Sequence, residues 1–319
     1  MGRPPSTTRP VGLFCGLAVV DVIQLVQAPP GPDDKIVALD QLIAAGGPAT
    51  NAAVAFAALG GRATLAAPVG AGPLAELVRA DLAGTGVELL DCSDRSGGSD
   101  GAGPAPGLSV SSCTITAGTG RRSVISTNAR AAVDTAPLDR YVARAACGQE
   151  TPPDVVLIDG HNPALARAAL DLAARVGALT VMDAGSWKDP AADLPARCDV
   201  VAASARFYPP GPAGPVTAPQ DVARWLLDAG ARGVVITRGE RSALWWAAGA
   251  RGSVQPPQVE AADTLGAGDV FHGALALALA GARRDQVTGP VLSAAVERAC
   301  AVAAASTTAF GTRAWLHQA

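Results

Sequence analysis

Several residue types are scarce in this sequence, and each scarcity excludes a class of function. Aromatic residues make up 4% of the 319 residues, so a platform on which single-stranded nucleic acid stacks its bases is not expected. The formal net charge is −3, and without a basic stripe a nucleic-acid partner is not predicted. Lysine occurs only at Lys35 and Lys188. An anionic substrate would therefore be held by local hydrogen-bond donors rather than by a general positive field.

Signals for zinc sites, disulfide bonds and membrane insertion are missing too. The six cysteines are scattered without a C-x-x-C pair and the three histidines are dispersed, so we predict reduced thiols in a cytoplasmic protein and no zinc site. The apolar run over residues 11–20 imitates a secretory signal, but Asp21 interrupts it and no cleavage site follows. The run is also too short to cross a bilayer. We interpret it as the first buried strand of a protein that does not associate with membranes.

What the sequence does contain is an alternation of two kinds of segment. Apolar, β-rich runs recur, and between several of them lie stretches with helical spacing, such as 164–175 and 220–229. This alternation is typical of βαβ units around a mostly parallel sheet covered on both faces. The fold class is therefore predicted to be α/β. The predicted strands cover residues 11–20, 63–68, 155–159, 179–183, 199–202 and 233–237.

Two regions depart from this alternation. Residues 22–45 contain a Pro-Pro-Gly-Pro run and then short alternating stretches, and residues 108–127 alternate polar and apolar residues around a Gly-Thr-Gly turn. The second region is typical of a β-hairpin. We predict that the two regions form a small β-sheet lid beside the main sheet. The Gly/Pro-rich stretches 93–107 and 209–219 are predicted to be loops rather than linkers, so residues 1–319 are expected to form a single domain.

The strongest motif is Asp263-Thr-Leu-Gly-Ala-Gly-Asp269, which leads into an alanine- and leucine-rich helix. Gly266 and Gly268 free the backbone to turn sharply at the helix start, which leaves the amides there, with that of Ala267 between them, pointing outward as an anion site. Fixed donors of this kind stabilise a phosphoryl group in transfer. Asp269 is placed to accept the proton of an attacking hydroxyl, and the helix N-terminus would favour its ionised form. The alternative is a glycine-rich loop capped by aspartates.

A second motif is Gly46-Gly47-Pro-Ala-Thr-Asn51, which precedes an apolar helical stretch. The two glycines give a close backbone approach to a helix whose first turn carries Asn51. The alternative is that Thr50 or Asn51 simply caps this helix.

Polar residues follow three of the predicted strands. Asp21, Asp159 and Asp183 each come at the end of an apolar run, and three such residues around one sheet edge indicate a polar cleft. His161-Asn162 follows one of these strands, and either a substrate contact or a capping role fits it. The basic side chains nearby are interpreted as exposed: Arg121, Arg122 and Lys188.

Taken in this order, the two motifs resemble the signatures of the ribokinase/PfkB family of carbohydrate kinases, G-G-x-x-x-N and D-T-x-G-A-G-D. The resemblance extends from about Val11 to about Trp315. No Walker-type G-x-x-x-x-G-K-[ST] is present, which excludes a P-loop kinase. The resemblance implies a ribokinase-like three-layer α/β/α sandwich with a mostly parallel central sheet and a small β-sheet lid. It also implies transfer of the γ-phosphoryl group of ATP to a sugar hydroxyl, with Mg²⁺ as cofactor.

The resemblance assigns roles to individual positions. Asp269 is the catalytic base, and the loop of Gly266, Ala267 and Gly268 cradles the transferred group. The implied sugar contacts are Asp21, Asp33 or Asp34, Gly46, Gly47 and Asn51, with Asn128 and Arg130 also facing the cleft. The implied nucleotide contacts are Thr237 and Gly239 of a T-x-G sequence together with Asp263, Thr264, Gly266 and Gly268.

One departure from the family pattern bears on the metal and the substrate. Many ribokinases carry N-x-x-E after the strand that corresponds to residues 199–202, where it helps to organise Mg²⁺. Here that stretch reads Ala-Ser-Ala-Arg-Phe over residues 203–207, so the Mg²⁺ ligands stay unassigned. Without this motif, the sequence most resembles ketohexokinase and sulfofructose kinase. This resemblance favours a ketohexose or sugar derivative as substrate. Whether a monovalent cation such as K⁺ is also a cofactor stays open.

Two other functions stay open. A nucleoside or ribose kinase would keep this fold, although the scarce aromatics of residues 1–150 do not favour a base-stacking pocket. A non-catalytic sugar-binding or sensor protein would also keep the fold, but the intact motif over residues 263–269 argues against it. A partner often covers the exposed strand edges of such a lid, so a homodimer through the lid is predicted.

Overall fold

The computed structural model describes residues 9–94 and 107–317. Its centre is a nine-stranded sheet in the order β13-β12-β11-β10-β9-β8-β1-β4-β5. All neighbouring strands are parallel except the pairs β11–β12 and β12–β13. The strands are β1 (Val11–Cys15), β4 (Arg62–Ala67), β5 (Val87–Asp91), β8 (Val155–Ile158), β9 (Leu179–Ala184), β10 (Val200–Ser204), β11 (Gly233–Arg238), β12 (Arg241–Ala247) and β13 (Ala250–Val254).

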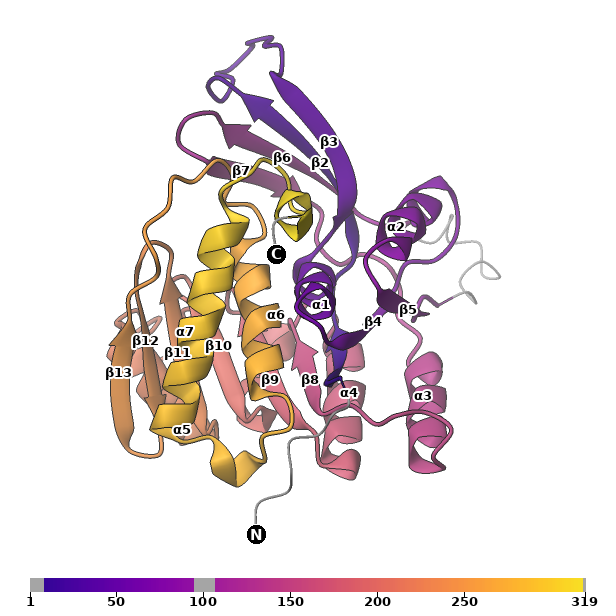
Figure 1. Ribbon diagram of the computed structural model, residues 1–319, viewed down its shortest axis with the longest axis vertical. Helices are drawn as coiled ribbons and strands as arrows, with labels where there is room; N and C mark the ends of the chain where they lie inside the picture. The colour runs from indigo at the N-terminus through magenta and orange to yellow at the C-terminus, as the bar shows by residue number, and fades with distance from the viewer. Residues whose placement is uncertain (1–8, 95–106, 318–319) are drawn as a thin grey trace.

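Helices cover both faces of this sheet (Figure 1). One face carries α1 (Pro48–Ala58), α2 (Pro73–Ala83), α6 (Ala267–Leu279) and α7 (Gly289–Ser306). The opposite face carries α3 (Ala136–Ala146), α4 (Pro163–Val176) and α5 (Pro219–Ala229). Short 3-10 helices occupy Asp189–Ala191, Pro195–Arg197, Arg284–Gln286 and Ala314–His317. The predicted three-layer α/β/α arrangement is confirmed, and the two apolar cores lie between the sheet and each helical layer.

A separate four-stranded sheet lies beyond the carboxyl ends of the main strands, at the top of Figure 1. Its order is β3-β2-β6-β7. The side that faces the main body buries Ile23, Cys113 and Ile115, which pack against Leu265 and Phe310. The strands are β2 (Val19–Val26), β3 (Asp40–Gly46), β6 (Val110–Thr116) and β7 (Arg121–Ser126). The hairpin predicted over residues 108–127 is therefore present as β6 and β7.

The prediction of one buried strand over residues 11–20 is wrong. The chain leaves the main sheet after Cys15 and enters the small sheet at Val19. Asp159 causes the break, because its Oδ2 accepts a hydrogen bond from the Leu17 amide at 2.8 Å. An α-carbon substituent at Gly16 would also collide with the Asp159 carboxylate. The small sheet consequently begins before residue 22, and Asp21 lies on β2 rather than at the end of a main-sheet strand.

The remaining predicted elements agree with the structure to within a few residues. The helical stretches 164–175 and 220–229 are α4 and α5, and residues 209–218 form no helix or strand. The other predicted loop, 93–107, falls largely outside the described residues. In the described part of the chain, no helix combines the length and the apolar character needed to cross a membrane.

Candidate active site

The parallel strands β1, β8, β9, β10 and β11 all end at one edge of the main sheet, under the small sheet (Figure 1). In doubly wound sheets this edge is where ligands bind. The predicted site residues gather here from the strand ends, from the first turns of α1 and α6, and from β2 and β3.

The loop before α6 is the segment predicted to form an anion cradle. Gly266 is the N-cap with φ +76°, a left-handed conformation that glycine adopts without strain, and no side chain caps the helix. The Ala267 amide reaches the Thr264 carbonyl at 3.5 Å, which is a weak hydrogen bond. In the described structure the amides of Gly268 and Asp269 have no hydrogen-bond partner. The positive end of α6 therefore presents free donors to a ligand.

Asp263 shapes this loop from below. Its Oδ1 accepts a hydrogen bond from the Leu265 amide at 2.7 Å, and its Oδ2 accepts one from the Gly311 amide at 3.0 Å. Burial raises the pKa of this carboxyl, and the two amide donors oppose that rise. Asp263 therefore holds the cradle against the chain that follows α7.

Asp269 occupies the first turn of α6, as predicted, and faces Asn51 of α1. Asn51 Nδ2 donates a hydrogen bond to Asp269 Oδ2 at 2.7 Å. Burial is the largest cause that raises the pKa of Asp269 to about 6, and the Asn51 hydrogen bond opposes it. The helix N-terminus was expected to favour the ionised form, and burial acts in the opposite direction by raising the pKa. A carboxyl with this pKa is still ionised at neutral pH and suits a general base.

Asp21 lies beside Asp269 on the inner side of the small sheet. It is 6% exposed, and burial raises its pKa to about 6, with a hydrogen bond from Ser111 opposing the rise and the charge of Asp269 adding to it. Gly46 packs directly on the Asp21 carboxylate, where a β-carbon would collide with it. Gly47 has φ +101° and lies against the Leu17 carbonyl, where a β-carbon would collide too. Packing inside the protein therefore requires a residue without a β-carbon at both positions.

The alternative that Thr50 or Asn51 caps α1 is wrong. The N-cap is Gly47, without a capping side chain, and the helix begins at Pro48. Thr50 Oγ1 donates a hydrogen bond to the Leu17 carbonyl at 3.1 Å, while Asn51 points to Asp269. The second motif therefore contributes its amide side chain to the site.

The other two predicted aspartates have different surroundings. Asp159 accepts hydrogen bonds from the amides of Leu17, Ala49 and His161, so it fastens the turn after β1 to the start of α1. Asp183 is buried, and its Oδ2 lies 3.2 Å from His272 Nδ1, although that nitrogen has no well-aligned hydrogen bond.

The Asp183–His272 pair is best described as neutral. His272 Nε2 lies 3.1 Å from the Ala202 carbonyl, and a carbonyl only accepts, so Nε2 carries the proton and Nδ1 is bare. Burial raises the pKa of Asp183 to about 8 and lowers the pKa of His272. A protonated Asp183 beside an unprotonated Nδ1 avoids two buried charges.

The tip of the β6–β7 hairpin rests on the cradle loop. Arg122 Nη1 donates to the Thr264 carbonyl at 2.7 Å, and Thr264 Oγ1 donates to the Gly120 carbonyl at 2.8 Å. The Thr264 amide donates to the same carbonyl at 3.1 Å. Arg121 and Arg122 are both exposed, as expected, but Arg122 is in addition bonded to the cradle loop.

Thr237 and Gly239 follow β11 at the same sheet edge. Thr237 Oγ1 donates to the Ala203 carbonyl at 3.4 Å, and Gly239 turns the chain into β12 with φ +66°. No hydrogen bond between described residues links these two to the cradle.

Several predicted residues are not brought to the site. Asp33 and Asp34 lie in the exposed loop between β2 and β3, where Asp34 accepts a hydrogen bond from Gly31. Asn162 Nδ2 donates to the Gly16 carbonyl at 2.9 Å and so has a structural role. Lys188 donates to the Ser186 carbonyl. Asn128 and Arg130 follow β7 with exposed side chains.

Sequence reasoning missed two residues of the site. His272 belongs to α6, the helix that the Asp263–Asp269 motif opens, but a histidine inside an apolar helix carries no signal of its partner. Arg313 follows α7, and its guanidinium reaches Asn51, Ala45 and Asp81. Nothing around Arg313 in the sequence marks it.

The described residues form no group of three or more His, Cys, Asp or Glu side chains that could hold a metal ion. Asp183 already faces His272, and Asp269 faces Asn51. Mg²⁺ keeps several waters and commonly binds through substrate phosphates plus one or two carboxylates. The donor set therefore fits a Mg²⁺ ion that arrives with a nucleotide, not a dedicated protein cage.

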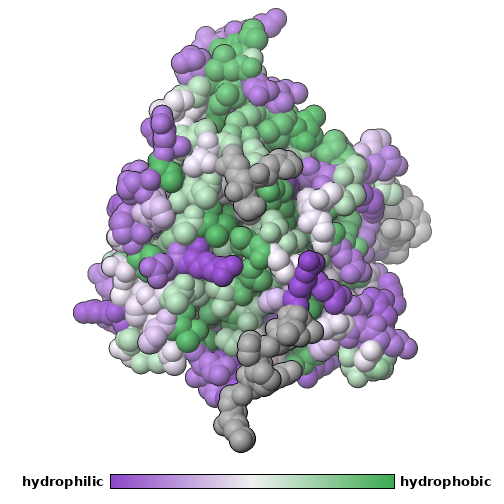
Figure 2. Space-filling model, viewed as in Figure 1, coloured by the Kyte–Doolittle hydropathy of each residue, from purple (hydrophilic) through white to green (hydrophobic). Residues whose placement is uncertain are grey.

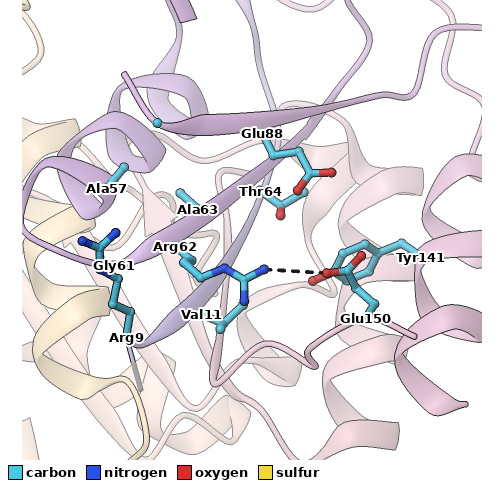
Figure 3. Close-up of a pocket in the computed structure, with 11 residues that line it drawn as sticks. Arg9, Val11, Ala57, Gly61, Arg62, Ala63, Thr64, Glu88, Tyr141 and Glu150 are labelled. Atoms are coloured by element: carbon cyan, nitrogen blue, oxygen red, sulfur yellow. Dashed lines mark ion pairs between the residues drawn. The ribbon is translucent and has the colours of Figure 1, made fainter. Parts of the chain in front are cut away.

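A pocket also lies at the opposite edge of the main sheet, where β1 and β4 begin (Figure 3). Arg62 spans it, with Nη2 lying 3.9 Å from Glu150 Oε1. Tyr141 lines the far wall. None of the predicted site residues contributes to this pocket.

Comparisons with known proteins identify the family and the fold. The pfkB family carbohydrate kinase model matches residues 13–319. The fold is similar to ribokinase from Giardia lamblia, with a TM-score of 0.78 and 14% identity over 97% of this chain and 96% of that chain. It is similar to Arabidopsis thaliana ribokinase complexed with ribose and ATP, with a TM-score of 0.67 and 16% identity over 96% and 94% of the two chains. It is also similar to phosphofructokinase-2 from Escherichia coli, with a TM-score of 0.69 and 20% identity over 94% of each chain.

The structural likenesses show the fold, and the family match covers the chain from the first strand of the main sheet to its end. Both motifs that form the site lie inside the matched region. The protein therefore belongs to the pfkB family of carbohydrate kinases, which transfer a phosphoryl group from ATP to a sugar.

Proposed function

We propose that the protein transfers the γ-phosphoryl group of ATP to a hydroxyl group of a ketohexose or sugar derivative, with Asp269 as the catalytic base. The observation that carries this proposal is the position of Asp269. It stands in the first turn of α6 among free backbone amides and touches Asn51. A proton acceptor and an anion cradle therefore meet at one point.

The proposed acceptor side of the site is lined by polar side chains that are almost fully buried. Asp21 and Asn51 are 6% and 5% exposed, and Gly46 packs against the first of them. Carboxylate and amide oxygens accept hydrogen bonds from sugar hydroxyl groups, and the amide nitrogen donates to them. We propose that these residues, together with Gly47, orient the sugar. Asp33 would contact it only if the β2–β3 loop folds inward.

The proposed reaction runs in one displacement. Asp269 accepts the proton of the sugar hydroxyl as the hydroxyl oxygen bonds to the γ-phosphorus. The bond from that phosphorus to the bridging oxygen breaks, and ADP leaves. The amides at Gly266–Gly268 hold the equatorial oxygens in transit. Thr237, Gly239, Asp263 and Thr264 are the proposed nucleotide-side residues.

Mg²⁺ neutralises the β- and γ-phosphate oxygens when it is bound with the nucleotide. We leave its protein ligands unassigned. A monovalent cation such as K⁺ is a further proposal, which a comparison of activity in potassium, sodium and choline chloride tests.

The decisive experiment pairs a substrate panel with one variant. Ketohexoses, pentoses, sulfofructose, hexose phosphates and nucleosides are offered with ATP, and ADP release is followed. Asp269→Asn should lower kcat by about 10³-fold, within the range known for general-base removal, while the Kd of ATP stays within a few-fold. Undiminished turnover in this variant would refute the base assignment. A nucleoside or ribose as the best substrate would favour the same-fold alternative, and no phosphorylation of any compound would favour a sensor.

We also propose that the protein is a single kinase domain that dimerises through the outer face of the small sheet, its lid. Val22, Ile43 and Ile125 share this face through the strand register. Ile43 is 48% exposed and Ile125 78% exposed, and Figure 2 shows hydrophobic residues over this sheet in the upper part of the view. Exposed apolar patches of this kind mark interfaces. A monomeric mass in light scattering would refute the dimer; a cytoplasmic location stays a prediction.

A further inference from the structure

Arg313 lies close to the reacting groups but far from both motifs in the sequence. It follows α7, in the turn before the 3-10 helix Ala314–His317. Its side chain is 18% exposed. Desolvation by burial lowers its pKa, and Asp81, Asp21 and Asp269 oppose that change. A guanidinium buried to this extent needs partners for its donors, or it destabilises the fold.

Those partners lie in three different segments. Arg313 Nη1 donates to Asn51 Oδ1 at 2.9 Å. Arg313 Nη2 donates to the Ala45 carbonyl of β3 at 2.6 Å and lies 3.4 Å from Asp81 Oδ2 on α2. The guanidinium fork thus connects the end of a small-sheet strand, α1 and α2 at a single point.

The contact with Asn51 decides how its amide is turned. The amide has an oxygen that only accepts and a nitrogen that only donates. Arg313 has donors alone, so it pairs with Oδ1 and leaves Nδ2 for the opposite side. On that side Nδ2 donates to Asp269 Oδ2 at 2.7 Å. The opposite orientation would set Oδ1 against the Asp269 carboxylate, and neither contact would survive.

We propose that Arg313 is a positioning residue for phosphoryl transfer, which fixes the Asn51 amide and through it holds the Asp269 carboxylate in place. This inference rests on the proposed role of Asp269 as base. Because Arg313 also grips the Ala45 carbonyl, it ties the position of Asp269 to that of β3 and so to the placement of the small sheet. Asp81 takes part only by anchoring the fork, because it touches the Ala45 amide and Arg313 and not Asn51.

The test compares Arg313→Met with Asp81→Asn. Both variants alter the same buried cluster, but only Arg313→Met frees the Asn51 amide. We expect Arg313→Met to lower kcat by about 10²-fold, the scale of an ångström-sized misplacement of a reacting group. The Kd of ATP should stay within a few-fold. Asp81→Asn should keep kcat within about threefold of the parent, because the Arg313–Asn51–Asp269 chain of contacts stays intact.

A purely structural role would not move the pH profile. Loss of the Asn51 hydrogen bond and of the Arg313 charge raises the pKa of Asp269, so the acid limb of kcat should move to higher pH in Arg313→Met and not in Asp81→Asn. In Arg313→Ala, added guanidinium at a non-denaturing concentration should restore part of kcat, and ammonium should restore less because it lacks the planar fork.

Each outcome decides between the alternatives. If folded Arg313→Met keeps kcat and its acid limb, or if Asp81→Asn loses as much kcat as Arg313→Met, the inference is wrong. If Arg313→Met does not fold, Arg313→Gln takes its place, because it also removes the charge, and the acid limb should again move to higher pH. Asp269→Asn is assayed in parallel. Full activity of Asp269→Asn would refute the assignment of Asp269 as the base. An inactive Asp269→Asn together with an unaffected Arg313 variant would refute only the positioning role of Arg313.

Discussion

The two halves of the site are built in different ways. The proposed nucleotide half comes mostly from one continuous loop, residues 263–269, and the first turn of the helix it opens, with Thr237 and Gly239 added at the end of β11. The acceptor half comes from Asp21, Gly46, Asn51 and Arg313, which belong to β2, β3, α1 and the turn after α7. Local turns shape most of the first half, and contacts of Asp263 with Gly311 and of Thr264 with Gly120 hold it in place. Long-range packing fixes the second, so its geometry depends on where the small sheet rests.

The hairpin of the small sheet joins the halves. Its tip rests on the nucleotide half through Arg122, Gly120 and Thr264, and its base lies beside Asp21 through Ser111. Arg313 makes a second connection, because it binds the Ala45 carbonyl of β3 and reaches Asp269 through Asn51. The comparison therefore predicts that changes in the acceptor half disturb the sugar more than the nucleotide, and that the reverse is true of changes in the cradle.

Among the changes that separate the two halves, Gly46→Ala should have the largest effect. The new β-carbon would collide with the Asp21 carboxylate, so Asp21 must shift away from the sugar. We expect kcat/KM for the sugar to fall by about 10²-fold through misplacement, with the Kd of ATP unchanged in calorimetry. Gly84→Ala is the matched control, because a β-carbon there meets nothing within 4 Å. Equal losses in the two variants, or a loss of ATP affinity in Gly46→Ala, would contradict the division into halves.

The pH dependence should separate the halves in another way. Asp269 must be ionised to accept a proton, and its pKa is about 6, so kcat should fall by about tenfold for each pH unit below 6. Asp21 also has a pKa of about 6, and its protonation should raise the KM of the sugar over the same range. A pH profile recorded at saturating and at limiting sugar distinguishes the two. A flat kcat down to pH 5 would show that Asp269 is not the base.

The smallest effects concern stability within the cradle. Gly266 has φ +76°, so Gly266→Ala should lower the free energy of unfolding by about 1–2 kcal/mol, the cost of a left-handed residue with a β-carbon. Gly268 has ordinary helical surroundings with nothing within 4 Å of an added β-carbon, so Gly268→Ala should leave stability unchanged or raise it by up to about 1 kcal/mol. Urea denaturation measures both. A Kd of ATP weakened in Gly268→Ala without loss of stability would place the phosphates against this residue.

The sequence by itself determined the elements and one half of the site. The period of the apolar residues predicted the α/β class, the hairpin and most strands, because burial and local geometry act over a few neighbouring residues. The nucleotide loop was readable for the same reason, since Gly266, Gly268 and Asp269 do their work within one helical turn. The two motifs, Gly46–Asn51 and Asp263–Asp269, together indicated the family, and the comparison confirmed it.

Only the tertiary structure decided the remainder. It moved Asp21 from the main sheet to the small one, because Asp159 holds the turn after β1. It showed Asn51 as a partner of Asp269 rather than a helix cap, and it brought His272 and Arg313 to the site. Such contacts join residues far apart in the chain, and no spacing rule records them. Burial also raises the pKa of Asp269, against the effect expected from the helix N-terminus, because desolvation depends on everything packed around a group and not only on the helix it begins.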